Sequence, residues 1–359
     1  MNDKIEIAKQ FAAAEIAPAV NPDFPAIFRK AAAAGLCGIG LPVEYGGSGG
    51  GYPEITAFAR ELTRHGGDAG IAFSLMYHLV VSRFMISGFG SAAQKEALLP
   101  DLAAGRKTVC FAVSEPGVGA HPKHIKATAA RNNGDFVLEG EKSYLSNGPA
   151  SDFYILIAIT ARDGDKKQFT AFLADRNLPG LTMTPLDVGW LKSSPHCGLR
   201  LEGCRVPASA ILGQPGSAYR DIVMPFRPLE DAVGTGLITG GLERIFAAQL
   251  KTLGAPGTAA AENLQEKIGR MYSILTALNT VSRQAAVVLE LSGINRELEG
   301  LCFWFREMAR EFIAIAASLP GYGEGDFGRD IGKLVDLGKN VSFLRQAKTG
   351  GILIKEGLK

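Results

Sequence analysis

The chain has 359 residues, of which 47% are hydrophobic and 21% charged, a globular composition long enough for two or three domains. Its formal net charge of +2 excludes a general basic field for binding nucleic acid. The N-terminal residues lack the apolar segment of a secretory signal, and no run is predicted to span a membrane. The five cysteines form no CxxC pair, so we expect free buried thiols in a cytoplasmic protein.

Residues 1–106 are predicted to form an N-terminal helical domain. Apolar residues recur at helical spacing from Ile5 to Ile16, and the prolines that follow end this helix. A second helical run closes at Gly35. The stretch LPVEYGGSGGGYP looks like a phosphate loop, but no Lys-Ser or Lys-Thr pair follows it, so we interpret it as a flexible turn.

Residues 107–216 are predicted to form a middle β domain of barrel or sandwich type. In HIKATAARNNGDFVLEGEK, two β-like runs flank an Asn-Gly pair, which is a strong signal for a hairpin. The runs DFYILIAIT and QFTAFLAD are further strand candidates, and CGLRLEGCRVP alternates until Pro207 stops it. The change from a helical to a β period marks this region as a separate unit.

Residues 217–359 are predicted to form a C-terminal helix bundle. The run AENLQEKIGRMYSILTALNTVSRQAAVVLEL has few helix breakers, and its apolar spacing suits packing against other helices. After Pro320 the chain becomes glycine-rich, and we expect a final short helix or coil. The predicted fold class is therefore α+β multidomain, in the order helices, β domain, helices.

Two polar turns of the middle region are about thirty residues apart, S-E-P-G-V-G at 114–119 and Y-L-S-N-G at 144–148. The first would expose backbone N–H groups that can donate to phosphate oxygens or ring carbonyls. The second places an aromatic ring and a hydroxyl on the same side of an extended run, which suits a planar heterocycle. Each signal alone is weak, because such turns and strand tyrosines are more often structural.

The order and spacing of these motifs are more specific. FAVSEPGVGAHP followed by LEGEKSYLSNG resembles the flavin-binding middle domain of the acyl-CoA dehydrogenase family, in which T-E-P-G-x-G-S-D precedes N-G-x-K-x-W/Y-I-T-N-G. GLPVEYGGSGG before this region and GWLKSSPHCGLRLEGCRVPASAILG after it are also similar to family motifs. The resemblance covers about residues 1–320. It implies a helix–β–helix fold, FAD as cofactor and an acyl-CoA substrate.

The resemblance also implies roles for individual residues of the first turn. Phe111, Val113 and Ser114 match positions that line the flavin ring, and Ser114 retains the hydroxyl of the usual Thr. Gly119 and Ala120 match the loop that meets the cofactor pyrophosphate and the pantetheine arm of the substrate. Ala120 replaces the usual Ser, so one hydroxyl contact is expected to be lost.

In the second turn, Tyr144 matches an aromatic residue that packs against the isoalloxazine. Ser146 matches a Thr whose hydroxyl reaches flavin N5, the hydride acceptor.

The family oxidises a thioester between its α and β carbons, and a carboxylate removes the α proton. The late Y-E-G-T motif that carries this base in most members is missing here. RPLEDAVGTGLITGGLERIF resembles the helix that carries the base in isovaleryl- and long-chain-type members, and it puts Glu230 at that position. The alternative is a helix N-terminal acid favoured by the macrodipole. Arg227 is a candidate for the substrate's phosphates, or else a solvated surface residue.

Three departures from the family pattern leave other functions open. Asp231 stands where the family usually has Arg, and the R-x-x-F-G motif, whose Arg reaches a neighbouring subunit's FAD, is absent from KTLGAPGTAAAENLQ. The region after Pro320 is also short. A non-catalytic thioester-binding relative is therefore one alternative, and a relative with other flavin chemistry, such as a desulfinase or monooxygenase, is another.

The leading prediction is an FAD-dependent acyl-CoA dehydrogenase that passes electrons to an electron-transfer flavoprotein and forms a homodimer or homotetramer. His121 and His124 have no further ligands nearby in the sequence, so no metal site is expected.

Overall fold

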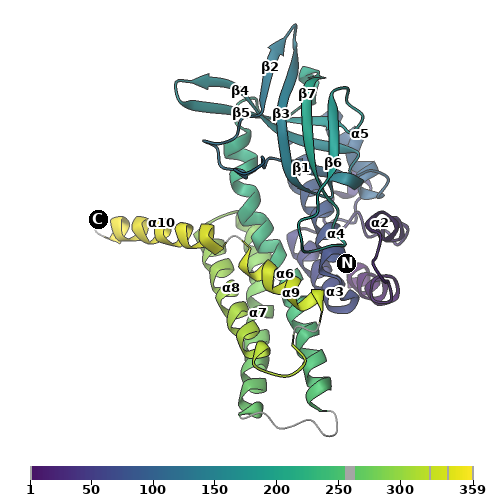
Figure 1. The fold of residues 1–359 in the computed structure, drawn as a ribbon, viewed down its shortest axis with the longest axis vertical. Coiled ribbons are helices and arrows are strands. Elements are labelled where there is room, and N and C mark those ends of the chain that lie inside the picture. Colours follow the sequence, from purple (N-terminus) through teal and green to yellow (C-terminus); the bar gives the residue numbers. More distant parts are fainter. Residues whose placement is uncertain (1, 255–262, 323–324, 338, 358–359) are drawn as a thin grey trace.

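The computed structural model describes residues 2–254, 263–322, 325–337 and 339–357. Helices form the first part, a β-sheet the middle and long helices the last part, so the α+β class predicted from the sequence is confirmed (Figure 1). The domain boundaries predicted after residues 106 and 216 fall in the segments between the last helix and first strand, and between the last strand and the next long helix.

The first part contains α1 (Asn2–Phe11), α2 (Phe24–Ala33), α3 (Tyr52–Gly66), α4 (Ala69–Val81) and α5 (Ala92–Ala103). Short π-helical segments extend α1 to Ile16 and α4 to Ser87. Asp68 begins α4 by accepting a hydrogen bond from the Ile71 backbone N–H at 2.8 Å, which satisfies a free donor of the first turn. The glycine-rich stretch after α2 is irregular apart from one 3-10 turn, as predicted.

The segment Ala69–Ser87 corrects the expectation that no run would be apolar enough for a membrane span. Of the described helices, this one is long and apolar enough to cross a membrane, with 19 residues and a mean hydropathy of 1.5. However, 89% of it is buried inside the protein, as in the core helix of a globular domain. In the sequence, His78 interrupts the apolar run, but its ring is buried and its Nε2 lies 3.1 Å from the Leu102 carbonyl oxygen.

The middle part is one sheet made of β1 (Val109–Ala112), β2 (Thr128–Asn132), β3 (Asp135–Ser146), β4 (Phe153–Asp163), β5 (Lys166–Asp175), β6 (Leu181–Pro185), β7 (His196–Val206) and β8 (Ile211–Leu212). The strand order is β6-β7-β3-β2-β4-β5-β8, and β1 pairs with β4. The predicted hairpin is confirmed, because β2 and β3 are antiparallel about Asn133 and Gly134. Both turn residues have positive φ, as a two-residue hairpin of this kind requires.

The continuous apolar run in β4 follows from burial on both faces of the sheet. Tyr154 and Leu156 belong to a core between the strands, whereas Ile155 and Ile157 pack into the larger core shared with the helices. A strand buried on both sides has no polar face, so its sequence does not alternate. The helices therefore cover one side of this sheet closely enough to form a site there.

The last part contains α6 (Met224–Leu253), α7 (Leu264–Ser292), α8 (Arg296–Ala317), α9 (Asp326–Asp336) and α10 (Lys339–Gly357). A final short helix or coil was expected, but the last helix, α10, has 19 residues and runs to the C-terminus at the left of Figure 1. Residues 255–262, in the stretch that lacks the family motif, and residues 323–324 of the glycine-rich segment lie outside the described residues.

Helix α6 lies directly on the backbone of α3. A Cβ added at Gly236 would come within 2.1 Å of the Thr56 carbonyl oxygen, and one at Gly240 within 2.2 Å of the Arg60 carbonyl oxygen. Only glycine allows two helices to approach this closely. The helix that carries Glu230 is therefore held against the N-terminal helices without side chains between them.

Candidate active site

A cavity of about 530 Å³ lies where the three parts of the chain meet, a volume typical of small-molecule sites. It is lined by Phe73, Tyr77, Phe111, Val113, Ser114, Ala120, Ser143, Tyr144, Ser146, Val188, Trp190, Leu191, His196, Val223, Phe226, Arg227, Glu230 and Leu337. Of the nine site residues predicted from the sequence, all except Gly119 are in this lining. The structure thus brings together residues that are more than a hundred positions apart.

Gly119 shapes the first turn and does not line the cavity. The backbone N–H of Glu115 donates to the Gly119 carbonyl at 3.0 Å, and the N–H of Gly119 donates back to Glu115 at 3.1 Å. Gly119 has a φ of +60°, a left-handed conformation that glycine adopts without strain. This tight turn brings the next residue, Ala120, into the cavity lining.

A buried ion pair joins the two turns. Lys142 Nζ lies 3.0 Å from Glu115 Oε1, and the two residues are 1% and 5% exposed. Lys142 also donates to the Val113 carbonyl at 3.2 Å, and the Glu115 carboxylate accepts two further backbone N–H groups. Burial lowers the pKa of Lys142, and Glu115 opposes this shift. Both residues lie within the two sequence motifs, but their pairing was not predicted from the sequence.

Tyr144 departs from the extended run that the sequence predicted. Its φ is +59°, and the pairing of β3 with β7 shifts register between Lys142 and Leu145. A bulge therefore directs the side chain, which lines the cavity although the residue is 59% exposed. A bulky residue in the left-handed region is unfavourable, and such strain is typical of functional positions.

Two more polar residues of the cavity wall come from the paired ends of β3 and β7. Ser146 Oγ lies 3.1 Å from His196 Nε2, and His196 Nδ1 lies 2.8 Å from the Ser194 carbonyl oxygen. His196 was not predicted from the sequence as a site residue, because only the register that places it opposite Ser146 reveals the contact. The hydroxyl of Ser143, which also lines the cavity, is buried and has no hydrogen-bond partner among the described residues.

Glu230 projects from the second turn of α6 into the cavity, with 19% of its side chain exposed. Burial raises the pKa of Glu230 above its ordinary value, and Arg227 opposes the rise from 3.4 Å away. A carboxylate with few water contacts and a raised pKa is a stronger base than one in bulk water. Of the described residues that line the cavity, Glu230 is the one that carries a carboxylate.

Asp231, the departure from the family pattern, is not in the cavity lining. Its carboxylate accepts from Arg227 Nη2 and from Arg306 Nη2, each at 2.8 Å, and Arg345 of α10 lies 3.7 Å away. Arg306 also donates to the carbonyls of Leu334 and Val335 at the end of α9. Asp231 therefore belongs to an arginine cluster that holds the end of α9 beside the cavity.

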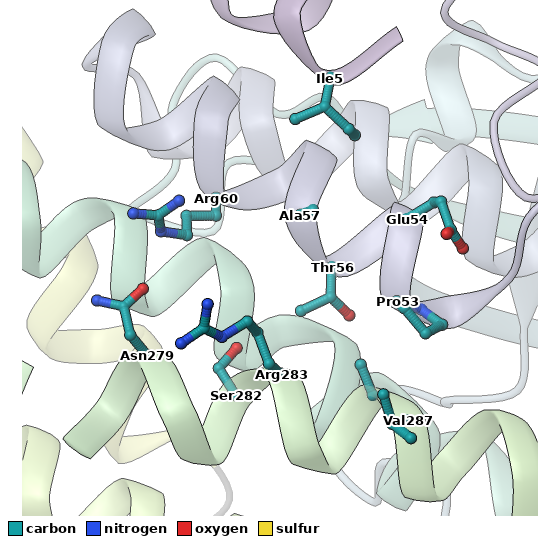
Figure 2. A pocket seen from close by; sticks show the side chains of 11 residues that line it. Ile5, Pro53, Glu54, Thr56, Ala57, Arg60, Asn279, Ser282, Arg283 and Val287 are labelled. Carbon is teal, nitrogen blue, oxygen red and sulfur yellow. The ribbon is translucent and has the colours of Figure 1, made fainter. Parts of the chain in front are cut away.

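A second cavity, of about 500 Å³, lies between α1, α3 and α7 (Figure 2). Arg60 of α3 faces Arg283 of α7 across it. Arg60 is held by Glu61 and Glu243 at 2.7 Å each, and Asn279 donates to the same Glu243 at 2.8 Å. This lining therefore offers ion pairs between helices and apolar surface, without the combination of aromatic rings, hydroxyls and a basic carboxylate found in the first cavity.

Comparisons with known proteins agree with this geometry. Residues 5–106 match the family model "Acyl-CoA dehydrogenase, N-terminal domain", and residues 110–204 match "Acyl-CoA dehydrogenase, middle domain". An acyl-CoA dehydrogenase of Bacillus subtilis is 29% identical over 325 residues, which cover 87% of this chain and 83% of that protein. The mitochondrial isovaleryl-CoA dehydrogenase of Solanum tuberosum is 28% identical over 336 residues, which cover 89% and 80%.

Among solved structures, butyryl-CoA dehydrogenase from Megasphaera elsdenii has the same fold. The TM-score is 0.85 at 23% identity, over 98% of this chain and 97% of that one.

Proposed function

The chain belongs to the acyl-CoA dehydrogenase family, and from this premise we propose that it is an FAD-dependent enzyme that oxidises an acyl-CoA thioester to the 2-enoyl-CoA. The observation that carries the proposal is the placement of Glu230 and Ser146 in one cavity with an aromatic wall. A base for the α proton and a hydrogen-bonding group for the hydride acceptor are the two requirements of this reaction.

The residues present fit a flavin. The rings of Phe111 and Tyr144 offer flat apolar surface, and the hydroxyls of Ser114 and Ser146 offer hydrogen bonds to a polar heterocycle. The unpartnered hydroxyl of Ser143 gives the site one further group that a ligand can satisfy. When bound, FAD would supply the hydride acceptor, N5, for the β carbon of the thioester.

Glu230 would take the α proton. Because burial raises its pKa, the carboxylate gains more from accepting a proton than one in bulk water does. Arg227 Nη1, 3.4 Å from Glu230 Oε2, limits this rise and helps to keep the side chain ionised before the substrate arrives. The position of Glu230 on the second turn of a long helix fixes the direction from which it approaches the substrate.

The roles of Arg227 and Ala120 in binding the substrate stay predictions. Arg227 donates to the Leu337 carbonyl at 3.1 Å as well as pairing with Asp231, so a phosphate would compete with partners already in place. Ala120 lines the cavity as a small residue, and its carbonyl accepts from the Tyr219 hydroxyl at 3.1 Å.

Electron-transfer flavoprotein as acceptor and a homodimer or homotetramer are further parts of the proposal. Large apolar side chains on the outer faces of α7 and α8 support association with other subunits, since Tyr272, Leu291 and Trp304 are 65%, 80% and 62% exposed.

The test is the visible absorption spectrum of the purified protein during anaerobic addition of a panel of acyl-CoA thioesters, with Glu230→Gln beside it. We expect a yellow protein that one thioester bleaches, and a variant that bleaches far more slowly. Bleaching at the same rate in the variant would remove Glu230 from the role of base. A yellow protein that no thioester bleaches would indicate the desulfinase or monooxygenase chemistry, and a colourless one that FAD cannot restore would indicate a non-catalytic relative.

A further inference from the structure

His196 is the histidine of this chain that lines the cavity, and both of its ring nitrogens have partners. Its Nδ1 lies 2.8 Å from the Ser194 carbonyl oxygen, and its Nε2 lies 3.1 Å from Ser146 Oγ. The contact joins the end of β3 to the start of β7, where the two residues are direct partners in the sheet. Ser194 is itself held by Ser74 of α4, whose hydroxyl oxygen is 2.8 Å from that of Ser194.

The two contacts define where the protons lie. A carbonyl oxygen can only accept, so the hydrogen bond to Ser194 requires a proton on Nδ1. A neutral imidazole then has a bare Nε2, which can only accept. The proton between His196 and Ser146 must therefore come from the serine hydroxyl, and Ser146 is the donor.

The surroundings favour this neutral ring. Burial lowers the pKa of His196, and the Ser194 carbonyl opposes that shift. The titratable groups that share the cavity are Glu230 and Arg227 on α6, Tyr77 on α4 and Tyr144 on β3. Within the described part of the chain, none of the carboxylates forms an ion pair with His196 that would stabilise a charged imidazolium.

We propose that His196 is a positioning residue that takes the only hydroxyl proton of Ser146 into a hydrogen bond, so that Ser146 presents oxygen lone pairs to the cavity. The inference rests on the proposed function for its consequence, because the cavity must hold a flavin. Oxidised N5 accepts hydrogen bonds, whereas reduced N5 carries a hydrogen and donates one. An accepting Ser146 therefore favours the reduced cofactor, and a serine freed from His196 would favour the oxidised one.

The proton arrangement can be tested on the apoprotein, without any cofactor, by ¹⁵N NMR of histidine-labelled protein at pH 8. His196→Gln assigns the signals by their loss. We expect a protonated Nδ1, a bare Nε2, and in Ser146→Ala a His196 pKa above that of the wild type, because the neutral ring loses a donor. A protonated Nε2 would overturn the proposal, and so would a spectrum and a pKa of His196 that are unchanged in Ser146→Ala.

The consequence is tested on the FAD-loaded protein by comparing His196→Gln, whose amide oxygen can still accept from Ser146, with His196→Phe, which cannot. At a fixed potential and pH 8, we expect the ratio of reduced to oxidised FAD to fall about fivefold or more in the Phe variant. This is the change that the loss of one hydrogen bond produces. The Gln variant should stay near the wild type. Equal ratios in the Phe variant and wild type would contradict the inference.

The two measurements separate this inference from the proposed function. A protein that binds no FAD would end the function as proposed, whereas the ¹⁵N spectrum would still decide whether Ser146 donates to His196. Thermal unfolding of each variant shows whether it is folded, and the apoprotein measurement on Ser146→Ala needs His196→Gln only to assign the signals.

Discussion

Two cavities of nearly equal volume, about 530 and 500 Å³, differ in the chemistry of their walls. The first has a carboxylate with a raised pKa, hydroxyls and aromatic rings drawn from all three parts of the chain. In the second, Arg60 and Asn279 are held by Glu243, and the remaining wall mixes aliphatic and polar side chains, with no aromatic ring among the described residues. The difference teaches that size does not identify a site, whereas the convergence of a carboxylate of raised pKa with hydroxyls and aromatic rings does.

The largest expected contrast between the cavities is catalytic. Glu230→Gln should slow flavin reduction by an acyl-CoA about 10²- to 10⁴-fold, because the amide cannot accept the α proton. Arg283→Ala, in the second cavity, should change the rate by no more than about twofold. Anaerobic stopped-flow spectroscopy measures both rates. Similar losses in the two variants would mean that the assignment of the cavities is wrong.

The buried ion pair that joins the two turns beside the first cavity should also contribute more to stability than the ion pair in the wall of the second. Lys142→Met leaves the Glu115 carboxylate buried without its cation, and we expect the free energy of unfolding to fall by about 3–5 kcal/mol. Arg60→Met removes a partly exposed cation, with an expected cost of roughly 1 kcal/mol. Urea unfolding gives both values. Equal losses in the free energy of unfolding would show that burial does not make the Lys142–Glu115 pair more important for stability than the pairs of Arg60.

Helix α6 carries Glu230 for the first cavity and packs on α3, which lines the second. Gly240→Ala should destabilise the protein by about 1–3 kcal/mol, because the added methyl group would lie against the Arg60 carbonyl. Gly269→Ala, on the exposed surface of α7, meets no neighbour and should instead stabilise by roughly 0.5–1 kcal/mol. Thermal unfolding distinguishes the signs, and a neutral Gly240→Ala would contradict the close contact.

The smallest expected effect is a shift in pH dependence at the first cavity. Glu230 acts as a base only when ionised, so flavin reduction should fall as the pH drops through its raised pKa. The nearby Asp231 charge contributes to that raised pKa, so Asp231→Asn should move the acid limb to lower pH, by less than about one unit. Rates measured from pH 4.5 to 8 test this, and an upward shift would oppose the argument.

The sequence predicted the order of helices and sheet, the hairpin at Asn133 and Gly134, and eight of the eighteen residues that line the first cavity. These succeed because local periodicity and turn chemistry are properties of short segments. The length of α10 was underestimated because glycines at 350 and 351 weaken the helical signal, although both lie inside the helix.

The features of the site that were not predicted from the sequence have a different cause. The pairing of Glu115 with Lys142 and of Ser146 with His196 depends on how distant segments align in space. Tyr144 was assigned to a regular strand because the bulge appears only when β3 is matched with β7. The contact of Ser146 with His196 and the bulge at Tyr144 belong to strand register, which no single segment encodes.

The contact between α3 and α6 has a mechanical consequence. Side chains between two helices can change rotamer and let the helices slide, whereas at Gly236 and Gly240 the two backbones meet with almost no compressible layer between them. A displacement of α6 along or towards α3 must therefore carry α3 with it. The carboxylate of Glu230 is therefore held as rigidly as the N-terminal helices. A change in the shape of the cavity would have to come from movement of the other wall, at the bulged end of β3.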